Sequence, residues 1–269
     1  MRSELPAVGF GTWKLENTPD TAEIVRNALQ AGYRLIDTAS AYGNEEAIGS
    51  AIAEADRSGL WISGKLWNDD RNRVEEACEK TIQNLKCDYL DLYLIHWPAS
   101  KALHPDWAEI NASVWARMEA LVKTGKVRNI GLSNFNRTQL EALLPHCSVF
   151  PLVNQIELHP GWPQIDLTEY CRRNGIAVQA WSPLRSGKLL RKKELISLAE
   201  QYGRTPAQVI LRWCVQRGVI PIVKSTNPQR MRSNLELDFS LSEADMNDLS
   251  SLSNLGWSGL DSETLTLFG

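Results

Sequence analysis

Four side chains with complementary proton chemistry lie near the ends of apolar segments early in the chain: Asp37, Tyr42, Lys65 and His96. A tyrosine is a poor acid near neutral pH, because its unperturbed pKa is about 10. A neighbouring ammonium favours the phenolate and lowers that pKa, and a carboxylate can hold the ammonium charged and in place. A histidine in the same pocket can orient a carbonyl oxygen. Together these groups would polarise a carbonyl and protonate its oxygen, and a cofactor would have to supply any hydride.

These side chains can act together only if the fold brings them to one place. Eight β-rich runs occupy residues 7–12, 33–39, 60–66, 90–97, 127–134, 151–158, 177–183 and 219–225, and stretches with helical spacing lie between them. The runs are almost continuously apolar, as expected of strands covered on both faces. The alternation predicts a single α/β domain over residues 1–269, a (β/α)8 TIM barrel. An open doubly wound sheet remains the alternative, because strand order cannot be read from a sequence.

A barrel of this kind carries its chemistry where the strands end and the helices begin. Each of the eight runs ends on, or is closely followed by, a polar residue. In the second to the eighth run these residues are Asp37, Lys65, His96, Ser133, Asn134, Gln155, Ser182, Lys224 and Ser225. We therefore predict one site, at the carboxyl ends of the strands.

The composition excludes several classes of function. The net charge is −3, with 29 basic and 32 acidic side chains in 269 residues, so we expect no nucleic-acid partner and no membrane partner. Five cysteines without a C-x-x-C pair predict reduced thiols and a cytoplasmic protein, and the first residues, MRSELPAVGF, do not read as a signal peptide. The four histidines lack metal-ligand spacing, so no metal is expected. GFGTW is only half of a dinucleotide-binding fingerprint. We expect a monomer.

Six motifs follow one another in an order that identifies a family. They are GFGTW, GYRLIDTASAYGNE, LDLYLIHWP, GKVRNIGLSNF, NQIELHP and KSTNPQRMRSN. From its first strand to about residue 236 the chain resembles the aldo-keto reductases, and most closely bacterial members of the 2,5-diketo-D-gluconate reductase type. The resemblance implies a (β/α)8 barrel and NADPH-dependent reduction of an aldehyde or ketone to an alcohol.

The same resemblance assigns roles to the four residues first singled out. Tyr42 would be the general acid, Lys65 would depress its pKa, Asp37 would hold Lys65, and His96 would orient the substrate carbonyl. Hydride would come from C4 of the nicotinamide.

The resemblance also places the cofactor. Its carboxamide would be bound by Ser133, Asn134 and Gln155, with Trp181 stacked on the ring where a tyrosine is more common. The pyrophosphate would meet the loop SPLRSG through Ser182, Leu184 and Ser186. The 2′-phosphate would lie among Lys224, Ser225, Thr226 and Arg230, which favours NADPH over NADH. Asn234 would contact the adenine, and Ser233, where the family carries Glu or Gln, would lose one adenine contact.

Trp13, Trp67 and Trp97 are expected to wall the substrate pocket, which would suit small aldehydes, α-dicarbonyls or keto sugars. The end of the chain would supply Trp257 or Phe268 to the pocket edge. The chain begins almost at the first barrel strand, which predicts that the hairpin closing the barrel floor in this family is largely missing. What covers the floor is left open.

Two other functions remain possible from the residues alone. One is a cofactor-sensing regulatory subunit with little turnover. The other is a barrel lyase or isomerase that uses Lys65 as a Schiff-base amine.

Overall fold

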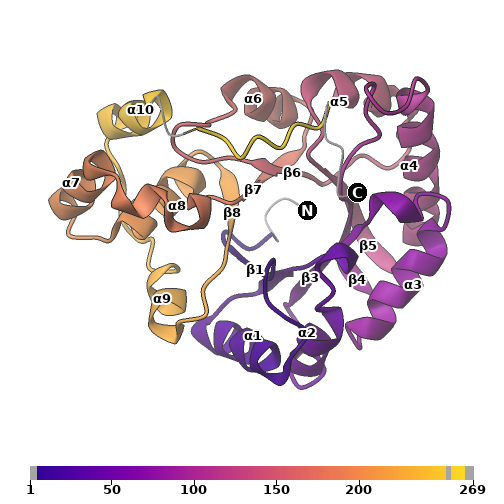
Figure 1. The fold of residues 1–269 in the computed structure, drawn as a ribbon, viewed down its shortest axis with the longest axis horizontal. Helices are drawn as coiled ribbons and strands as arrows, with labels where there is room; N and C mark the ends of the chain where they lie inside the picture. The colour runs from indigo at the N-terminus through magenta and orange to yellow at the C-terminus, as the bar shows by residue number, and fades with distance from the viewer. Residues whose placement is uncertain (1–4, 253–255, 264–269) are drawn as a thin grey trace.

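Eight short parallel strands close into one barrel in the computed structural model, which describes residues 5–252 and 256–263 (Figure 1). The strands are β1 (Gly9–Gly11), β2 (Leu35–Asp37), β3 (Trp61–Leu66), β4 (Leu90–Ile95), β5 (Val127–Ser133), β6 (Val153–Glu157), β7 (Ala177–Trp181) and β8 (Val219–Val223). They pair in chain order, and β1 also pairs with β8, which closes the sheet. All eight predicted runs are confirmed, each shortened at one or both ends, and the closed barrel replaces the open-sheet alternative.

A ring of helices surrounds the strands (Figure 1). They are α1 (Pro19–Ala31), α2 (Glu45–Ile52), α3 (Val74–Asn84), α4 (Trp107–Lys123), α5 (Arg137–Leu143), α6 (Ile165–Arg173), α7 (Lys193–Gln201), α8 (Pro206–Gln216), α9 (Pro228–Ser233) and α10 (Glu243–Ser251). Local sequence sets several ends. Thr205 and Gln208 form a capping box at α8, and α1 ends at Gly32, whose φ of 112° suits a residue without a Cβ. Within the described residues, no helix has the length and apolar character needed to span a membrane.

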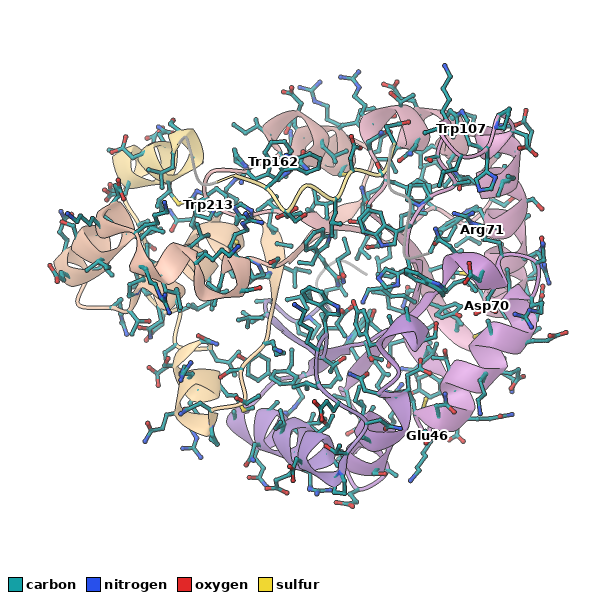
Figure 2. All side chains as sticks on the ribbon, viewed as in Figure 1. Glu46, Asp70, Arg71, Trp107, Trp162 and Trp213 are labelled. Carbon is teal, nitrogen blue, oxygen red and sulfur yellow. The ribbon has the colours of Figure 1, made fainter. Side chains whose placement is uncertain are left out.

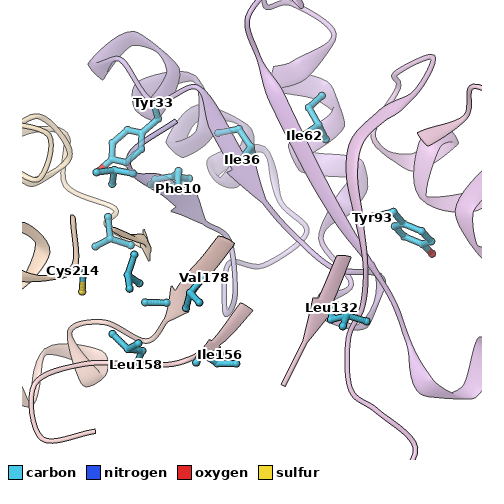
Figure 3. Packing of buried hydrophobic residues seen from close by; sticks show 14 of the residues in the cluster. Phe10, Tyr33, Ile36, Ile62, Tyr93, Leu132, Ile156, Leu158, Val178 and Cys214 are labelled. Atoms are coloured by element: carbon cyan, nitrogen blue, oxygen red, sulfur yellow. The ribbon is translucent and has the colours of Figure 1, made fainter. Parts of the chain in front are cut away.

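The main core lies between the barrel and the helices. Outward-facing strand residues such as Phe10, Ile36 and Ile62 are fully buried there, and Phe10 packs edge-on against Tyr33 at 5.4 Å between ring centroids. Figure 3 shows these side chains in the layer between strands and helices. Because strand side chains alternate in direction, burying Ile36 on the outer face turns Asp37 toward the barrel interior.

A smaller apolar cluster fills the lower part of the interior. Leu92, Leu94 and Val153 form it, and Leu5 and Trp61 pack against it from the end where the strands begin. These two side chains therefore cover part of the barrel floor, which answers the question that the sequence left open.

Candidate active site

Lys65 is the centre of the site, and it is completely buried. Its ammonium donates to Asp37 Oδ2 at 2.6 Å and to the Thr38 carbonyl at 2.9 Å. It also approaches the Tyr42 hydroxyl at 3.4 Å. Strands β2 and β3 pair in register, and the 3-10 turn η2 (Ser40–Tyr42) carries Tyr42 back over the same opening. Hydrogen bonds thus join three of the four residues that the sequence singled out, namely Asp37, Lys65 and Tyr42.

His96 completes the group from the end of β4. Its ring meets the Tyr42 ring edge-on at 5.7 Å between centroids, and it meets the Trp67 ring at 5.1 Å. The Nδ1 atom of His96 is buried and has no hydrogen-bond partner among residues 5–252 and 256–263. Burial, together with the nearby Lys65 charge, holds the pKa of His96 well below its usual value. The imidazole is therefore neutral, so one ring nitrogen carries a proton that it can donate to a carbonyl oxygen.

The charges of the buried pair are set by its surroundings. Burial alone would lower the pKa of Lys65, but Asp37 and Tyr42 carry that pKa above its usual value. Burial raises the pKa of Tyr42 more than Lys65 lowers it, so the pKa lies above that of a free tyrosine. Lys65 does act in the predicted direction, although its contribution is smaller than that of burial. At neutral pH the site therefore holds an ammonium, a neutral phenol and a neutral imidazole.

The three residues predicted to bind a carboxamide also meet at this opening. Ser133 Oγ donates to the Gln155 carbonyl at 3.0 Å, and Asn134 Nδ2 donates to the His96 carbonyl at 3.0 Å. Trp181 Nε1 donates to Asn134 Oδ1 at 2.7 Å. The sequence predicted only that Trp181 stacks on the nicotinamide ring, so this bond is an additional contact. Asn134 has a φ of 64°, in the left-handed region, and its bonds to the His96 carbonyl and Trp181 hold its side chain at the mouth.

Gln155 has a second set of contacts that the sequence did not predict. Its Nε2 atom donates across the barrel to Asp37 Oδ1 at 2.9 Å and to Gln179 Oε1 at 2.9 Å. Gln179 was missed because its run, AVQAW, was read as an apolar strand. The available signal was the two-residue spacing between Gln179 and Trp181, which places both side chains on the inner face.

The loop after β7 has the strained backbone expected of a ligand loop. Ser182, Arg185 and Ser186 have φ values of 53°, 50° and 51°, which side chains with a Cβ rarely adopt. All three belong to the predicted pyrophosphate loop SPLRSG, and Ser182 and Ser186 are two of its three predicted contacts.

The segment after β8 is basic and has no acidic partner nearby. Lys224 and Arg230 make no ion pair with any residue in the described ranges. Partial burial and the neighbouring Lys14 lower the pKa of Lys224. Two cations without acidic partners on the same segment fit an anionic group, so the residues present suit the phosphate of a dinucleotide.

The remaining predicted residues of this segment differ in their surroundings. Ser225 bonds within its turn to Asn227, the cap of α9, at 3.1 Å, and Thr226 is exposed beside it. Asn234 is buried near the Tyr33 hydroxyl, and Ser233 is half-buried at the end of α9.

Two of the three predicted pocket tryptophans are close to the group formed by Asp37, Tyr42, Lys65 and His96. Trp67 contacts the His96 ring, and Trp97 is 7% exposed. Trp13 is 49% exposed on the loop after β1, with the Lys14 ammonium over its ring at 4.4 Å. Trp257 stacks on Trp162 at 5.1 Å, on the side of α6 where Figure 2 labels Trp162. Phe268 lies outside the described residues.

Glu157, at the end of β6, is a further buried group that the sequence did not single out. Its carboxylate accepts from the Ser258 backbone N–H at 2.9 Å, from Ser258 Oγ at 2.6 Å and from Arg185 at 3.4 Å. It therefore joins the end of the chain to the loop after β7.

Known proteins resemble this chain over nearly its whole length. A family model described as the aldo/keto reductase family matches residues 7–254. Glyoxal reductase of Bacillus subtilis (strain 168) is 43% identical over 254 residues, covering 93% of this chain and 89% of the relative. Methylglyoxal reductase DkgA of Yersinia pestis is 41% identical over 247 residues, covering 90% and 87%.

Solved structures agree with the sequence comparison. An aldo-keto reductase, MGS-M4, from a Medee basin deep-sea metagenome library superposes with a TM-score of 0.91 at 34% identity, covering 98% of this chain and 97% of the other. The D53A mutant of Gox0644, solved in complex with NADPH, gives a TM-score of 0.89 at 37% identity, covering 98% and 95%.

Proposed function

This chain belongs to the aldo/keto reductase family, and we propose that it reduces small aldehydes or ketones with NADPH, with Tyr42 as the proton donor. One observation carries the proposal. The Lys65 ammonium touches both the Asp37 carboxylate and the Tyr42 hydroxyl, at 2.6 Å and 3.4 Å. This places a cation where it stabilises the phenolate left behind when Tyr42 gives up its proton.

Each residue of the group then has one task. Tyr42 is protonated at neutral pH and donates its proton to the carbonyl oxygen as negative charge develops there. Neutral His96 donates a hydrogen bond to the same oxygen and orients it. Asp37 keeps Lys65 charged and fixed. The nicotinamide, when bound, supplies a hydride from C4.

The cofactor contacts belong to the same proposal. Gln155, Asn134 and Ser133 would hold the carboxamide beside Trp181. The loop residues Ser182, Leu184 and Ser186 would hold the pyrophosphate. Lys224 and Arg230, which lack acidic partners among the described residues, would bind the 2′-phosphate together with Ser225 and Thr226, and Asn234 would meet the adenine. This arrangement favours NADPH over NADH.

The substrate class rests on the relatives and on the pocket walls. Relatives named glyoxal reductase and methylglyoxal reductase suggest that α-dicarbonyls are the first compounds to test, with small aldehydes and keto sugars beside them. Trp67 and Trp97 offer an apolar, aromatic wall suited to small uncharged carbonyl compounds. The closer resemblance to 2,5-diketo-D-gluconate reductases stays a prediction.

The electrostatics argue against the Schiff-base alternative. An imine-forming lysine must lose its proton, and this is achieved by lowering its pKa. Here Asp37 and Tyr42 outweigh the effect of burial and raise the pKa of Lys65. Lys65 therefore stays an ammonium and is a poor nucleophile.

The test is NADPH oxidation by the purified protein with glyoxal, methylglyoxal, an aromatic aldehyde and a keto sugar, each repeated with NADH. We expect turnover with at least one α-dicarbonyl and a higher kcat/KM with NADPH. NADPH binding without turnover on any substrate would favour the regulatory-subunit alternative instead.

A further inference from the structure

The side chain of Gln179 lies inside the barrel and, within the described residues, makes one hydrogen bond, to Gln155 of the proposed site. It is completely buried, and its Oε1 atom accepts from Gln155 Nε2 at 2.9 Å. Gln155 and Gln179 are register partners on β6 and β7, so both side chains point inward from the same level of the barrel. Gln179 Nε2 has no partner among residues 5–252 and 256–263.

Lys65, Asp37, Gln155 and Gln179 are joined by successive hydrogen bonds, and Lys65 fixes which partner donates in each of them. The Lys65 ammonium can only donate, so Asp37 faces it as a carboxylate acceptor. The other oxygen of Asp37 also accepts, so Gln155 must present its NH2 group to it, at 2.9 Å. The second N–H of that group needs an acceptor, and Gln179 Oε1 supplies it.

Both protons of Gln155 Nε2 are therefore used inside the barrel. What Gln155 has left to offer a ligand is its Oε1 atom, which is a pure acceptor. An acceptor selects the NH2 end of a ligand amide and rejects its carbonyl end. A nicotinamide ring turned over by half a rotation about its glycosidic bond would carry the carboxamide to its other edge, away from Gln155, so a carboxamide held at Oε1 selects one ring face.

We propose that Gln179 is a positioning residue for hydride transfer: by accepting from Gln155, it fixes the Gln155 amide so that Oε1 faces the cofactor carboxamide and selects one face of the nicotinamide ring. This inference rests on the proposed NADPH-dependent reduction. Gln179 itself touches neither substrate nor cofactor. Its effect passes through Gln155, which also donates to Asp37 Oδ1, the carboxylate oxygen that Lys65 does not contact.

A purely structural role for Gln179 makes a different prediction. If Gln179 only filled space, an apolar side chain of similar length would leave stability and cofactor binding unchanged. Such a side chain would even remove the buried Gln179 N–H group that has no partner in the described part of the chain. If Gln179 orients Gln155, the loss of Oε1 frees the Gln155 amide to turn about its last torsion angle. The site would then accept the nicotinamide in two orientations.

The test compares Gln179→Met with Gln179→Glu. Methionine has a similar length but no oxygen acceptor, whereas glutamate keeps one. Val178→Ala is the matched control, because Val178 is buried on the outer face of the same strand and has no link to Gln155. Three quantities are measured: the Kd for NADP+ by quenching of tryptophan fluorescence, the thermal midpoint, and deuterium transfer from NADPH labelled on one face of C4.

We expect the wild type to transfer deuterium from one labelled face only. Gln179→Met should transfer from both faces and bind NADP+ about tenfold more weakly, as expected when one hydrogen bond to the carboxamide is lost. Gln179→Glu should restore single-face transfer, and Val178→Ala should lower the thermal midpoint without changing the face used.

Failure of the inference can be told from failure of the proposed function. Wild-type protein without NADPH-dependent turnover would overturn the function itself. Wild-type turnover with single-face transfer and unchanged NADP+ affinity in Gln179→Met would overturn the role of Gln179 alone. If Gln179→Met does not fold, mixed-face transfer in Gln179→Glu would overturn the inference, and single-face transfer would support it.

Discussion

At the scale of single residues, the site depends on one buried ion pair with a phenol beside it. We expect Tyr42→Phe to abolish carbonyl reduction, with a loss in kcat of about a thousandfold, since a positioned proton donor contributes on the order of 10² to 10⁴. Within the part of the chain that the structure describes, the Tyr42 hydroxyl hydrogen-bonds with Lys65 alone, so NADPH binding should persist. Steady-state kinetics and a fluorescence titration check both points. Turnover close to that of the wild type would remove Tyr42 as the proton donor.

His96 links pH to stability with a definite sign. Its pKa is well below normal in the folded protein, because burial and Lys65 disfavour the charged form. The unfolded chain binds a proton near pH 6.5 while the folded chain does not, so acidification favours unfolding. Between about pH 7.5 and about pH 5.5, this residue should remove on the order of 1 kcal/mol from the free energy of unfolding. Urea titrations at both pH values check this, and His96→Asn should show a smaller loss.

Arg230 and Arg232 form a matched pair on α9. Both are exposed, and neither makes an ion pair with another described residue, but only Arg230 was predicted to contact the cofactor. We expect Arg230→Ala to weaken NADPH binding about tenfold and to leave NADH almost unchanged, because a charge-assisted bond to phosphate contributes about 1.5–3 kcal/mol. Arg232→Ala should change neither. Equal losses for NADPH and NADH in Arg230→Ala would exclude the phosphate contact.

At the scale of elements, strand positions could be predicted from the sequence and tertiary hydrogen bonds could not. Near-continuous apolar runs such as 90–97 marked the strands, because both faces of a parallel barrel are covered. The pairing of Trp181 with Asn134, and that of Gln155 with Gln179, depend on which loops meet across the mouth. Spacing along the chain can place such side chains on the inner face, but it does not tell which of them meet. The sequence accordingly singled out Asp37, Tyr42, Lys65 and His96, but it did not predict the hydrogen bond between Gln155 and Gln179 that lies behind Asp37.

Gly49 shows how tightly one helix approaches its neighbour. It lies in α2, and a Cβ placed on it would stand 2.2 Å from the Asn84 carbonyl oxygen. In an isolated helix, Gly→Ala stabilises by about 1 kcal/mol. Here the backbone of α3 would have to move, so we expect Gly49→Ala to destabilise the fold by about 2 kcal/mol. Chemical unfolding measures this, with Ser50→Ala, one residue along the same helix, as the control. A more stable Gly49→Ala would show that α2 and α3 can separate without cost.

At the scale of the whole molecule, opposite sides of the barrel are joined through its interior and the end of the chain is joined to its rim. The bond from Gln155 to Asp37 connects β6 with β2 across the barrel. On the rim, residues 256–263, yellow in Figure 1, run past β6 and α6 toward α5. Their anchor is Glu157, which accepts three bonds from Ser258.

The attachment of this terminal segment can be tested apart from the barrel. Burial would raise the pKa of Glu157, but bonds from His159 and Ser258 lower it, so the anchor is an anion. We expect Glu157→Ala to release residues 256–263, with amide exchange there rising by at least tenfold while the strands stay protected, because segments held by few bonds open locally. Exchange followed by mass spectrometry measures both. Ser262→Ala is the control, since its hydroxyl makes a single long bond of 3.4 Å to Gln139. Unchanged exchange at residues 256–263 in Glu157→Ala would mean that other contacts hold the segment, such as the stacking of Trp257 on Trp162 or the bond from Asn136 to Glu263.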